Sequence, residues 1–201
     1  MKPEAAQWKP HPWHGLPIGP KSPSVVNAFI EITPFDLIKY EVDKQTGYLT
    51  IDRPQGTSSL PPTLYGFIPQ TYCGRRVAAL AEKAGHGDED PLDICVITER
   101  PIGRSEVFAP ARVVGVLRGI DEGKADDKII AILDSDPFWS HINEMEQLPS
   151  VIIQRLHHYF NTYKHMPGET NQMSVIAEEG RDAAIRIVEA ALQDYQEFIG
   201  Q

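Results

Sequence analysis

Acidic residues gather in one short segment of the chain. Residues 87–93 read Gly-Asp-Glu-Asp-Pro-Leu-Asp, so Asp88, Asp90 and Asp93 lie within six positions, just before an apolar run. Carboxylates this close repel one another unless a cation neutralises them. Hard divalent cations prefer carboxylate oxygens, and Mg²⁺ typically binds a few carboxylates together with water and phosphate oxygens. Pro91 fixes the backbone between the aspartates. The segment therefore predicts a divalent-metal site.

A calcium loop of the EF-hand type is the first alternative for this segment. That loop needs oxygen ligands at positions 1, 3 and 5 and a glycine at position 6. Counted from Asp88, position 5 is Leu92 and position 6 is Asp93, and a strand is expected where the loop would continue. The pattern therefore excludes an EF-hand.

A second acidic cluster spans residues 121–128, Asp-Glu-Gly-Lys-Ala-Asp-Asp-Lys, between two expected strands. Taken alone, it is typical of a solvated acidic loop. Two acidic loops at strand ends can, however, face the same mouth of a barrel and together hold several Mg²⁺ ions. Paired metals can clamp a phosphate and activate a water molecule at neutral pH.

Basic and phenolic residues add to this pattern. Lys39 and Glu41 share one face of an expected strand, because side chains alternate along a strand. Arg53 ends the next strand, Lys128 closes the second acidic cluster, and Tyr163-Lys164 follows an expected helix. Each one alone is typical of a surface charge or a half-buried tyrosine. Together they supply the cations and hydroxyl groups that phosphoryl transfer requires.

The elements expected to position these residues are strands first and helices later. Alternating apolar and polar residues predict strands, among them a hairpin turning at residues 43–47, and a continuous apolar run at 129–133 predicts a strand buried on both faces. Strands are expected at 28–32, 38–42, 48–52, 65–69, 93–98, 107–118 and 129–133. Helices are expected at 75–84, from Asp136-Pro137, from Pro149 to Pro167-Gly168, and at 181–198.

This order predicts an α+β fold that is mainly β, a small barrel with helices packed outside it. Residues 1–24 contain six prolines and two tryptophans, Trp8 and Trp13, which predict an extended arm over the surface. We expect residues 25–201 to form a single domain, because no long linker divides them.

The composition of the chain excludes several classes of protein. The chain has 201 residues and a formal net charge of −9, which argues against a nucleic-acid coat or a polybasic membrane binder. No apolar stretch approaches the length of a membrane helix, and no secretory leader is recognisable. Cys73 and Cys95 lack metal-ligand spacing, and Cys95 is expected to be buried. A cytoplasmic location fits best.

The ordered set of motifs resembles soluble family I inorganic pyrophosphatase. The resemblance covers about residues 28–165, and its most specific piece is the string Asp-Glu-Asp-Pro-Leu-Asp at 88–93. The other pieces are Glu31-Ile32, 38–44, Asp52-Arg53, 65–69, 121–128 and Tyr163-Lys164. It implies a five-stranded barrel of the oligonucleotide-binding (OB) type with flanking helices. It also implies hydrolysis of pyrophosphate, bound as its magnesium complex, to two phosphates by direct attack of a metal-bridged water or hydroxide.

The resemblance also implies roles for individual residues. Asp90 is the general base. Several Mg²⁺ ions are held by Asp88, Asp93, Asp121 and Asp126, with Glu31 beside them. Phosphate oxygens are bound by Lys39, Arg53, Tyr65, Lys128, Tyr163 and Lys164, with Glu41 and Glu122 in support.

Some features depart from the family pattern. The stretch at residues 75–87 and the proline-rich arm are additions, and they could alter contacts in the homo-oligomer that the family implies. A non-catalytic metal- or nucleotide-binding barrel is the alternative function. A nucleic-acid-binding barrel is disfavoured, because such a groove presents aromatic side chains to bases, whereas here the groove region is acidic.

Overall fold

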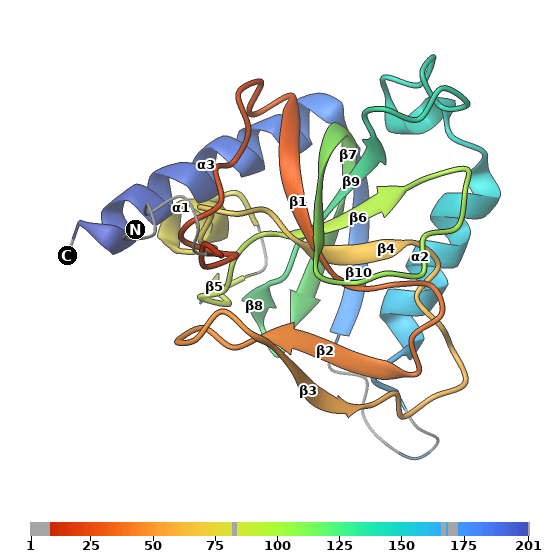
Figure 1. The fold of residues 1–201 in the computed structure, drawn as a ribbon, viewed down its shortest axis with the longest axis horizontal. Helices are drawn as coiled ribbons and strands as arrows, with labels where there is room; N and C mark the ends of the chain where they lie inside the picture. The colour runs from red at the N-terminus through yellow and green to blue at the C-terminus, as the bar shows by residue number, and fades with distance from the viewer. Residues whose placement is uncertain (1–8, 82–83, 166–167, 169–172, 201) are drawn as a thin grey trace, which may run out of the picture.

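A closed ring of five strands forms the centre of the structure (Figure 1). The computed structural model describes residues 9–81, 84–165, 168 and 173–200. In order around the ring, the strands are β1 (Val25–Ile32), β4 (Leu64–Phe67), β6 (Asp93–Ile97), β9 (Lys128–Leu133) and β7 (Val107–Asp121). The ring closes because β7 also pairs with β1. The predicted mainly β fold with a five-stranded, OB-type barrel is confirmed.

The strand β7 is long enough to pair with four other strands. Its residues 107–112 pair with β1, residues 111–117 with β9, and residues 115–121 with β10 (Met173–Gly180). Its last two residues also pair with the short strand β8 (Lys124–Ala125), which in turn pairs with β5 (His86–Gly87). No pattern in the sequence predicted β5, β8 or β10.

Two apolar cores cover opposite faces of the barrel strands. On β9, Ile129 and Ala131 belong to the core shared with α3 (Arg181–Ile199), whereas Ile130 and Ile132 belong to the core shared with α2 (Ser150–Thr162). Successive side chains of a strand point to opposite faces, so a strand covered on both sides must be apolar throughout. This confirms the expectation drawn from the continuous apolar run.

The helices agree with the sequence analysis in position and less well in length. α3 coincides with the predicted final helix, and α2 begins directly after Pro149. α2 ends at Thr162, earlier than predicted, and Pro167 lies outside the described residues. α1 spans only Arg75–Ala79 of the predicted 75–84.

The helix expected at Asp136-Pro137 is wrong. The chain there forms turns, followed by the short 3₁₀ helix η2 (Met145–Gln147). The Asp136 carboxylate accepts hydrogen bonds from the backbone N–H groups of Glu99 at 2.7 Å and Phe138 at 2.9 Å. It therefore joins two separate turns and does not cap a helix.

A separate two-stranded hairpin lies below the barrel in Figure 1. It consists of β2 (Ile38–Val42) and β3 (Leu49–Pro54), as predicted. The turn between them closes through a hydrogen bond from the Gly47 N–H to the Asp43 carbonyl at 2.8 Å. Gly47 has φ +72°, a conformation that glycine adopts at little cost.

The described part of the N-terminal arm, residues 9–24, has neither helix nor extended strand. Trp13 is buried, with 4% of its surface exposed, as expected of an anchor, whereas Trp8 lies outside the described residues. The division into an arm and one domain stays a prediction. Cys95 is buried as predicted, and Cys73 is buried too. Among the described residues, no helix has the length and apolar character needed to cross a membrane.

Gly66 allows β4 to approach β1 closely, and this gives a test of the barrel. A Cβ atom at Gly66 would lie 1.9 Å from the carbonyl oxygen of Phe29. We expect Gly66→Ala to lower the free energy of unfolding by at least about 2 kcal/mol, because the backbone must shift to relieve the clash. The control is Gly56→Ala, where no atom lies within 4 Å. Urea titration of Gly56→Ala should show a change within about 1 kcal/mol. Equal stability of the two variants would contradict the close approach.

Candidate active site

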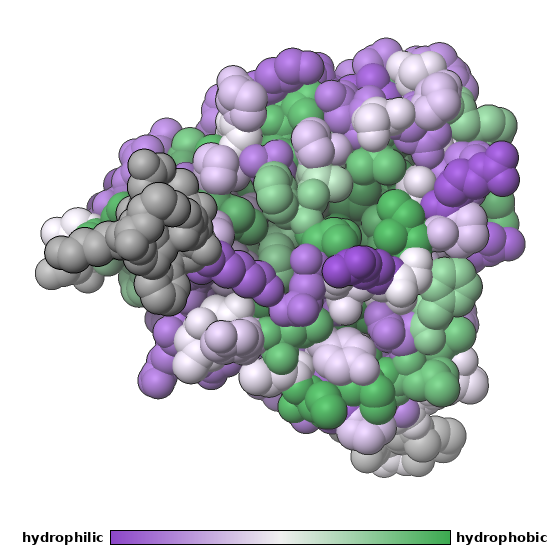
Figure 2. Space-filling model, in the orientation of Figure 1, coloured by the Kyte–Doolittle hydropathy of each residue, from purple (hydrophilic) through white to green (hydrophobic). Residues whose placement is uncertain are grey.

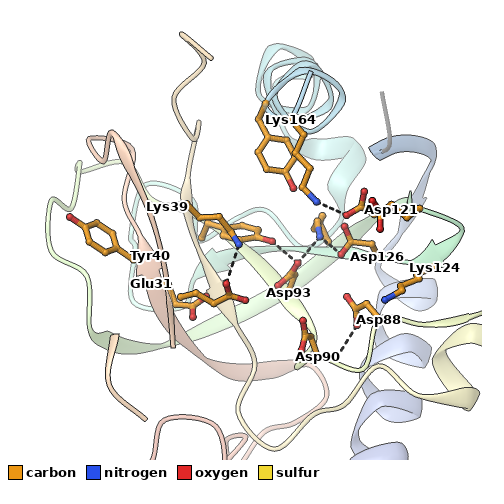
Figure 3. A pocket seen from close by; sticks show the side chains of 15 residues that line it. Glu31, Lys39, Tyr40, Asp88, Asp90, Asp93, Asp121, Lys124, Asp126 and Lys164 are labelled. Atoms are coloured by element: carbon orange, nitrogen blue, oxygen red, sulfur yellow. Dashed lines mark hydrogen bonds and ion pairs between the residues drawn. The ribbon is translucent and has the colours of Figure 1, made fainter. Parts of the chain in front are cut away.

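A pocket of about 230 Å³ opens where the β2–β3 hairpin faces the end of the barrel (Figure 3). Its lining contains eight carboxylates and four lysines, with three tyrosines. These residues are Glu31, Glu41, Asp88, Asp90, Asp93, Asp121, Glu122, Asp126, Lys39, Lys124, Lys128, Lys164, Tyr40, Tyr65 and Tyr163. Segments that are far apart in the sequence therefore contribute to one strongly charged pocket.

The structure brings together all but one of the residues proposed from the sequence. The exception is Arg53, which is not among the residues lining the pocket; its guanidinium binds the Asp52 carboxylate at 2.6 Å. Lys39 binds the same carboxylate, also at 2.6 Å, so Asp52 connects Arg53 to the edge of the pocket. Lys39 also lies 3.3 Å from Glu41, in agreement with the prediction that they share one strand face.

Four residues at the site were not assigned by sequence reasoning. Tyr40 and Lys124 line the pocket, Lys44 pairs with Asp90, and Asp52 holds Lys39. Lys124 lies inside the second acidic cluster, so its position there was an available signal. No local signal connected Lys44 to Asp90, because the contact joins the hairpin turn to a loop 46 residues away.

Lys128 lies at the base of the pocket and is 1% exposed. Its ammonium group contacts Asp93 at 2.5 Å and also pairs with Asp126. The parallel pairing of β6 with β9 places Asp93 directly opposite Lys128. Tyr65 donates a hydrogen bond to the same Asp93 oxygen at 2.5 Å. The sheet register thus builds the centre of the site.

The loop before β6 turns sharply at Glu89, whose φ of +68° is unusual for a residue other than glycine. This turn lets the Asp90 backbone N–H donate to the Asp88 carboxylate at 3.1 Å. Both side chains line the pocket (Figure 3). Gly87, just before them, passes so close to the Cys73 carbonyl that a Cβ would lie 1.9 Å from it. The loop is therefore held against the barrel.

The opposite wall carries Asp121, at the end of β7, paired with Lys164, just after α2. The other carboxylate oxygen of Asp121, Oδ1, is buried and has no hydrogen-bond partner among the described residues. An oxygen in that position normally has a donor or a cation beside it. It is one observation that favours a cation in this pocket.

Burial and mutual repulsion raise the pKa values of several pocket carboxyls. Burial raises the pKa of Asp88 to about 8, and the nearby Asp126 and Asp93 add to the effect. Burial also raises the pKa of Glu31 to about 8 and moves that of Asp93 upward. Burial alone would lower the pKa of Lys128, but Asp126 and Asp93 outweigh it and raise that pKa well above its ordinary value.

These raised pKa values come first from burial and second from repulsion between neighbouring carboxylates. No group of three or more His, Cys, Asp or Glu side chains in the described ranges is already arranged as a metal cage. Instead, lysines pair with the carboxylates, as Lys128 does with Asp93 and Asp126. The donor set is nevertheless all oxygen, which suits Mg²⁺, and added cations would relieve the repulsion that raises the carboxyl pKa values.

The pKa of Asp88 predicts how stability changes with pH in the metal-free protein. Between about pH 4 and pH 8 the folded state holds a proton on Asp88 that the unfolded state has released, so stability falls as pH rises through this range. Asp88→Asn removes this contribution. We expect the melting temperature of the unchanged protein, measured with a chelator, to fall relative to that of Asp88→Asn between pH 5 and pH 8.

The exposed Asp182, in the first turn of α3, is the matched control. Asp182→Asn should follow the unchanged protein at every pH, apart from a constant offset. Parallel curves for Asp88→Asn and the unchanged protein would contradict the raised pKa.

Comparisons with known proteins agree with this geometry. The family model described as "Inorganic pyrophosphatase" matches residues 28–196. Inorganic pyrophosphatase of Chlamydia caviae is 40% identical over 195 residues, covering 92% of this chain and 90% of the relative. Soluble inorganic pyrophosphatase 1 of Arabidopsis thaliana is 34% identical, covering 94% of this chain and 82% of the relative.

Solved structures similar to this one are also inorganic pyrophosphatases. The crystal structure of inorganic pyrophosphatase from Thermus thermophilus superposes with a TM-score of 0.79 at 33% identity, covering 92% of this chain and 99% of that one. Sequence, fold and the charged pocket are therefore consistent with one another, and the chain belongs to the inorganic pyrophosphatase family.

Proposed function

We propose that this chain hydrolyses inorganic pyrophosphate to two phosphate ions in the pocket described above, with several Mg²⁺ ions per site. The observation that carries the proposal is the lining of eight carboxylates and four lysines around about 230 Å³. Pyrophosphate is small and highly charged, so its binding must be electrostatic. The net charge of −9 would repel the free anion, and we infer that it binds as its magnesium complex.

The carboxylates fall into two groups suited to hold the metal ions. We assign Asp88, Asp93 and Asp126 to one metal ion and Asp121 with Asp126 to a second, with Glu31 beside them, and all of these side chains line the pocket. When bound, Mg²⁺ would neutralise phosphate oxygens and lower the pKa of a coordinated water. Two observations support this assignment: Oδ1 of Asp121 has no hydrogen-bond partner in the described part of the chain, and the carboxyl pKa values are raised.

Asp90 is the proposed general base. It orients the attacking water and accepts its proton as the water oxygen bonds to phosphorus and the bond from phosphorus to the bridging oxygen breaks. Its side chain lines the pocket and pairs with Lys44. A general base must lie within hydrogen-bond reach of the water it activates, and a carboxylate in the wall of the pocket can do so. No phosphoenzyme forms.

The cationic and phenolic groups are proposed to bind phosphate oxygens. These groups are Lys39, Arg53, Tyr65, Lys128, Tyr163 and Lys164, supported by Glu41 and Glu122. All three of these lysines have carboxylate partners. Phosphate oxygens would replace those partners as the metal ions bind the carboxylates, so each lysine would keep an anionic partner.

Exposed apolar residues on the hairpin support a homo-oligomer. Leu37 and Ile51 are 68% and 69% exposed. Apolar side chains gather over this hairpin on the face shown in Figure 2. Apolar surface of this kind is typical of protein contacts. We further propose a cytoplasmic protein without a nucleic-acid partner, consistent with two free cysteines and an acidic chain.

The proposed function predicts fast release of phosphate from pyrophosphate by the purified protein in Mg²⁺. Release should stop when a chelator is added, and ATP should give little phosphate, because the pocket is small. A folded protein that binds Mg²⁺ but releases no phosphate would instead favour the non-catalytic metal- or nucleotide-binding barrel. Phosphate is measured colorimetrically over time.

Asp90→Asn tests the proposed base. The amide cannot accept the proton, so we expect kcat to fall roughly 10²- to 10⁴-fold, the range typical of a lost general base. Its melting temperature should stay close to that of the unchanged protein. Glu89→Gln is the matched control, because Glu89 is in the same loop but is exposed and does not line the pocket. Near-normal turnover by Asp90→Asn would remove Asp90 from this role.

A further inference from the structure

The N-terminal arm faces the Asp90 loop across a small cavity. Trp13 is 4% exposed and borders this cavity of about 60 Å³ together with Lys44, Asp90, Pro91 and Asp93. Its indole packs in an apolar cluster and stacks on Phe198 of α3, with ring centroids 5.8 Å apart. An arm residue therefore lines the same cavity as the loop that carries the proposed base.

Hydrogen bonds connect Trp13 to Gln70 and Thr71. The indole Nε1–H donates to the Thr71 carbonyl at 2.8 Å, and the Gln70 N–H donates to the Trp13 carbonyl at 2.9 Å. Gln70 has φ +57°, so the chain turns sharply where the arm holds it. Thr71 is fully buried, and its carbonyl would lose this donor if the indole were replaced by a phenyl ring.

Residues 71–73 also form hydrogen bonds with the Asp90 loop. Thr71 Oγ1 accepts a hydrogen bond from the Leu92 N–H at 2.9 Å, and the Cys73 N–H donates to the Asp90 carbonyl at 2.8 Å. The backbone on either side of Pro91 is thus fixed by residues 71–73, and Trp13 in turn fixes those residues. The path from indole to Asp90 contains only buried or backbone hydrogen bonds.

The arm also packs on the hairpin turn that carries Lys44, the ion-pair partner of Asp90. A Cβ added at Gly47 would lie 2.8 Å from the His11 ring and 2.9 Å from Pro12, so the arm packs tightly on the 43–47 turn. That turn carries Lys44, which pairs with Asp90. The arm therefore supports both the backbone of Asp90 and its ion-pair partner.

We propose that Trp13 is a positioning residue for the hydrolysis, holding Asp90 at the place where it can accept the proton of the attacking water. This inference rests on the proposed role of Asp90. A general base displaced by a fraction of an ångström loses much of its effect, because catalysis depends on precise orientation. In the described part of the arm, no hydrogen bond or ion pair reaches the groups proposed to bind phosphate, so substrate affinity should depend little on Trp13.

The test is a double-mutant cycle between Trp13→Phe and Asp90→Asn, with kcat and KM measured for each variant well below its melting temperature. Trp13→Phe should lower kcat roughly tenfold and change KM less than about twofold. In the Asp90→Asn background, where no base is left to position, the same change should lower kcat less than about twofold.

Trp139→Phe is the matched control. Trp139 packs against the core on the α2 side, and its Nε1 is buried without a hydrogen-bond partner among the described residues, so the substitution loses no donor bond. We expect its kcat to be normal. Equal falls in kcat from Trp13→Phe in both backgrounds, or a normal kcat for Trp13→Phe, would overturn the inference. Normal turnover by Asp90→Asn alone would mean that the assigned base, on which the inference rests, is wrong.

Discussion

The ion pairs of the buried Lys128 with Asp93 and Asp126 connect the fold of this protein to its chemistry. An ammonium group that is 1% exposed is stable only beside opposite charge, because transfer of an unpaired ion from water is very costly. The partner Asp93 is supplied by the register of β6 on β9. Shifting that pairing by one residue would move every side chain to the opposite face. The register of β6 on β9 therefore supplies the carboxylate that the buried Lys128 needs, and that ion pair in turn favours this register.

The acidic loops around Lys128 have little freedom to adjust. Gly87 and Gly119 lie where a Cβ would come within 1.9 Å of the Cys73 carbonyl and 2.1 Å of the Asp126 carbonyl. The backbone that carries Asp88 and Asp126 is therefore packed directly on neighbouring backbone. A rigid set of carboxylates cannot move apart to reduce its repulsion. Burial, with the repulsion of Asp126 and Asp93 added to it, raises the pKa of Asp88 to about 8, and bound cations would relieve that repulsion.

The carboxylates that are proposed to bind metal ions also reduce the stability of the fold. Without cations, the carboxylates repel one another and reduce stability, and lysines that are proposed to bind phosphate pair with them instead. The lost stability is compensated by the two apolar cores, which cover both faces of the barrel. The arm also adds apolar surface near this site, because the buried Trp13 lines a cavity beside the loop that carries Asp90.

Much of the local structure could be predicted from spacing along the chain. The alternation at 38–42 and 48–52 predicted the hairpin, the apolar run at 129–133 predicted a strand buried on both faces, and the helical spacing after residue 181 predicted α3. Each of these signals is local, because neighbouring residues determine the period. The expected helix at Asp136 failed because its carboxylate binds Glu99, 37 residues away.

The strand β10 and the site likewise depend on contacts between residues that are far apart in the sequence. β10 forms because residues 115–121 of β7 extend past β1 and leave that edge unpaired, a contact that residues 173–180 do not encode by themselves. The acidic string at 88–93 and the cluster at 121–128 identified the chemistry, and the family resemblance assigned the partners. The sequence by itself determined which charged groups are available. Only the closed barrel decided that residues from Glu31 to Lys164 share one pocket, that Arg53 does not line it, and that Lys44 pairs with Asp90. These contacts join distant segments, and only tertiary packing can bring such segments together.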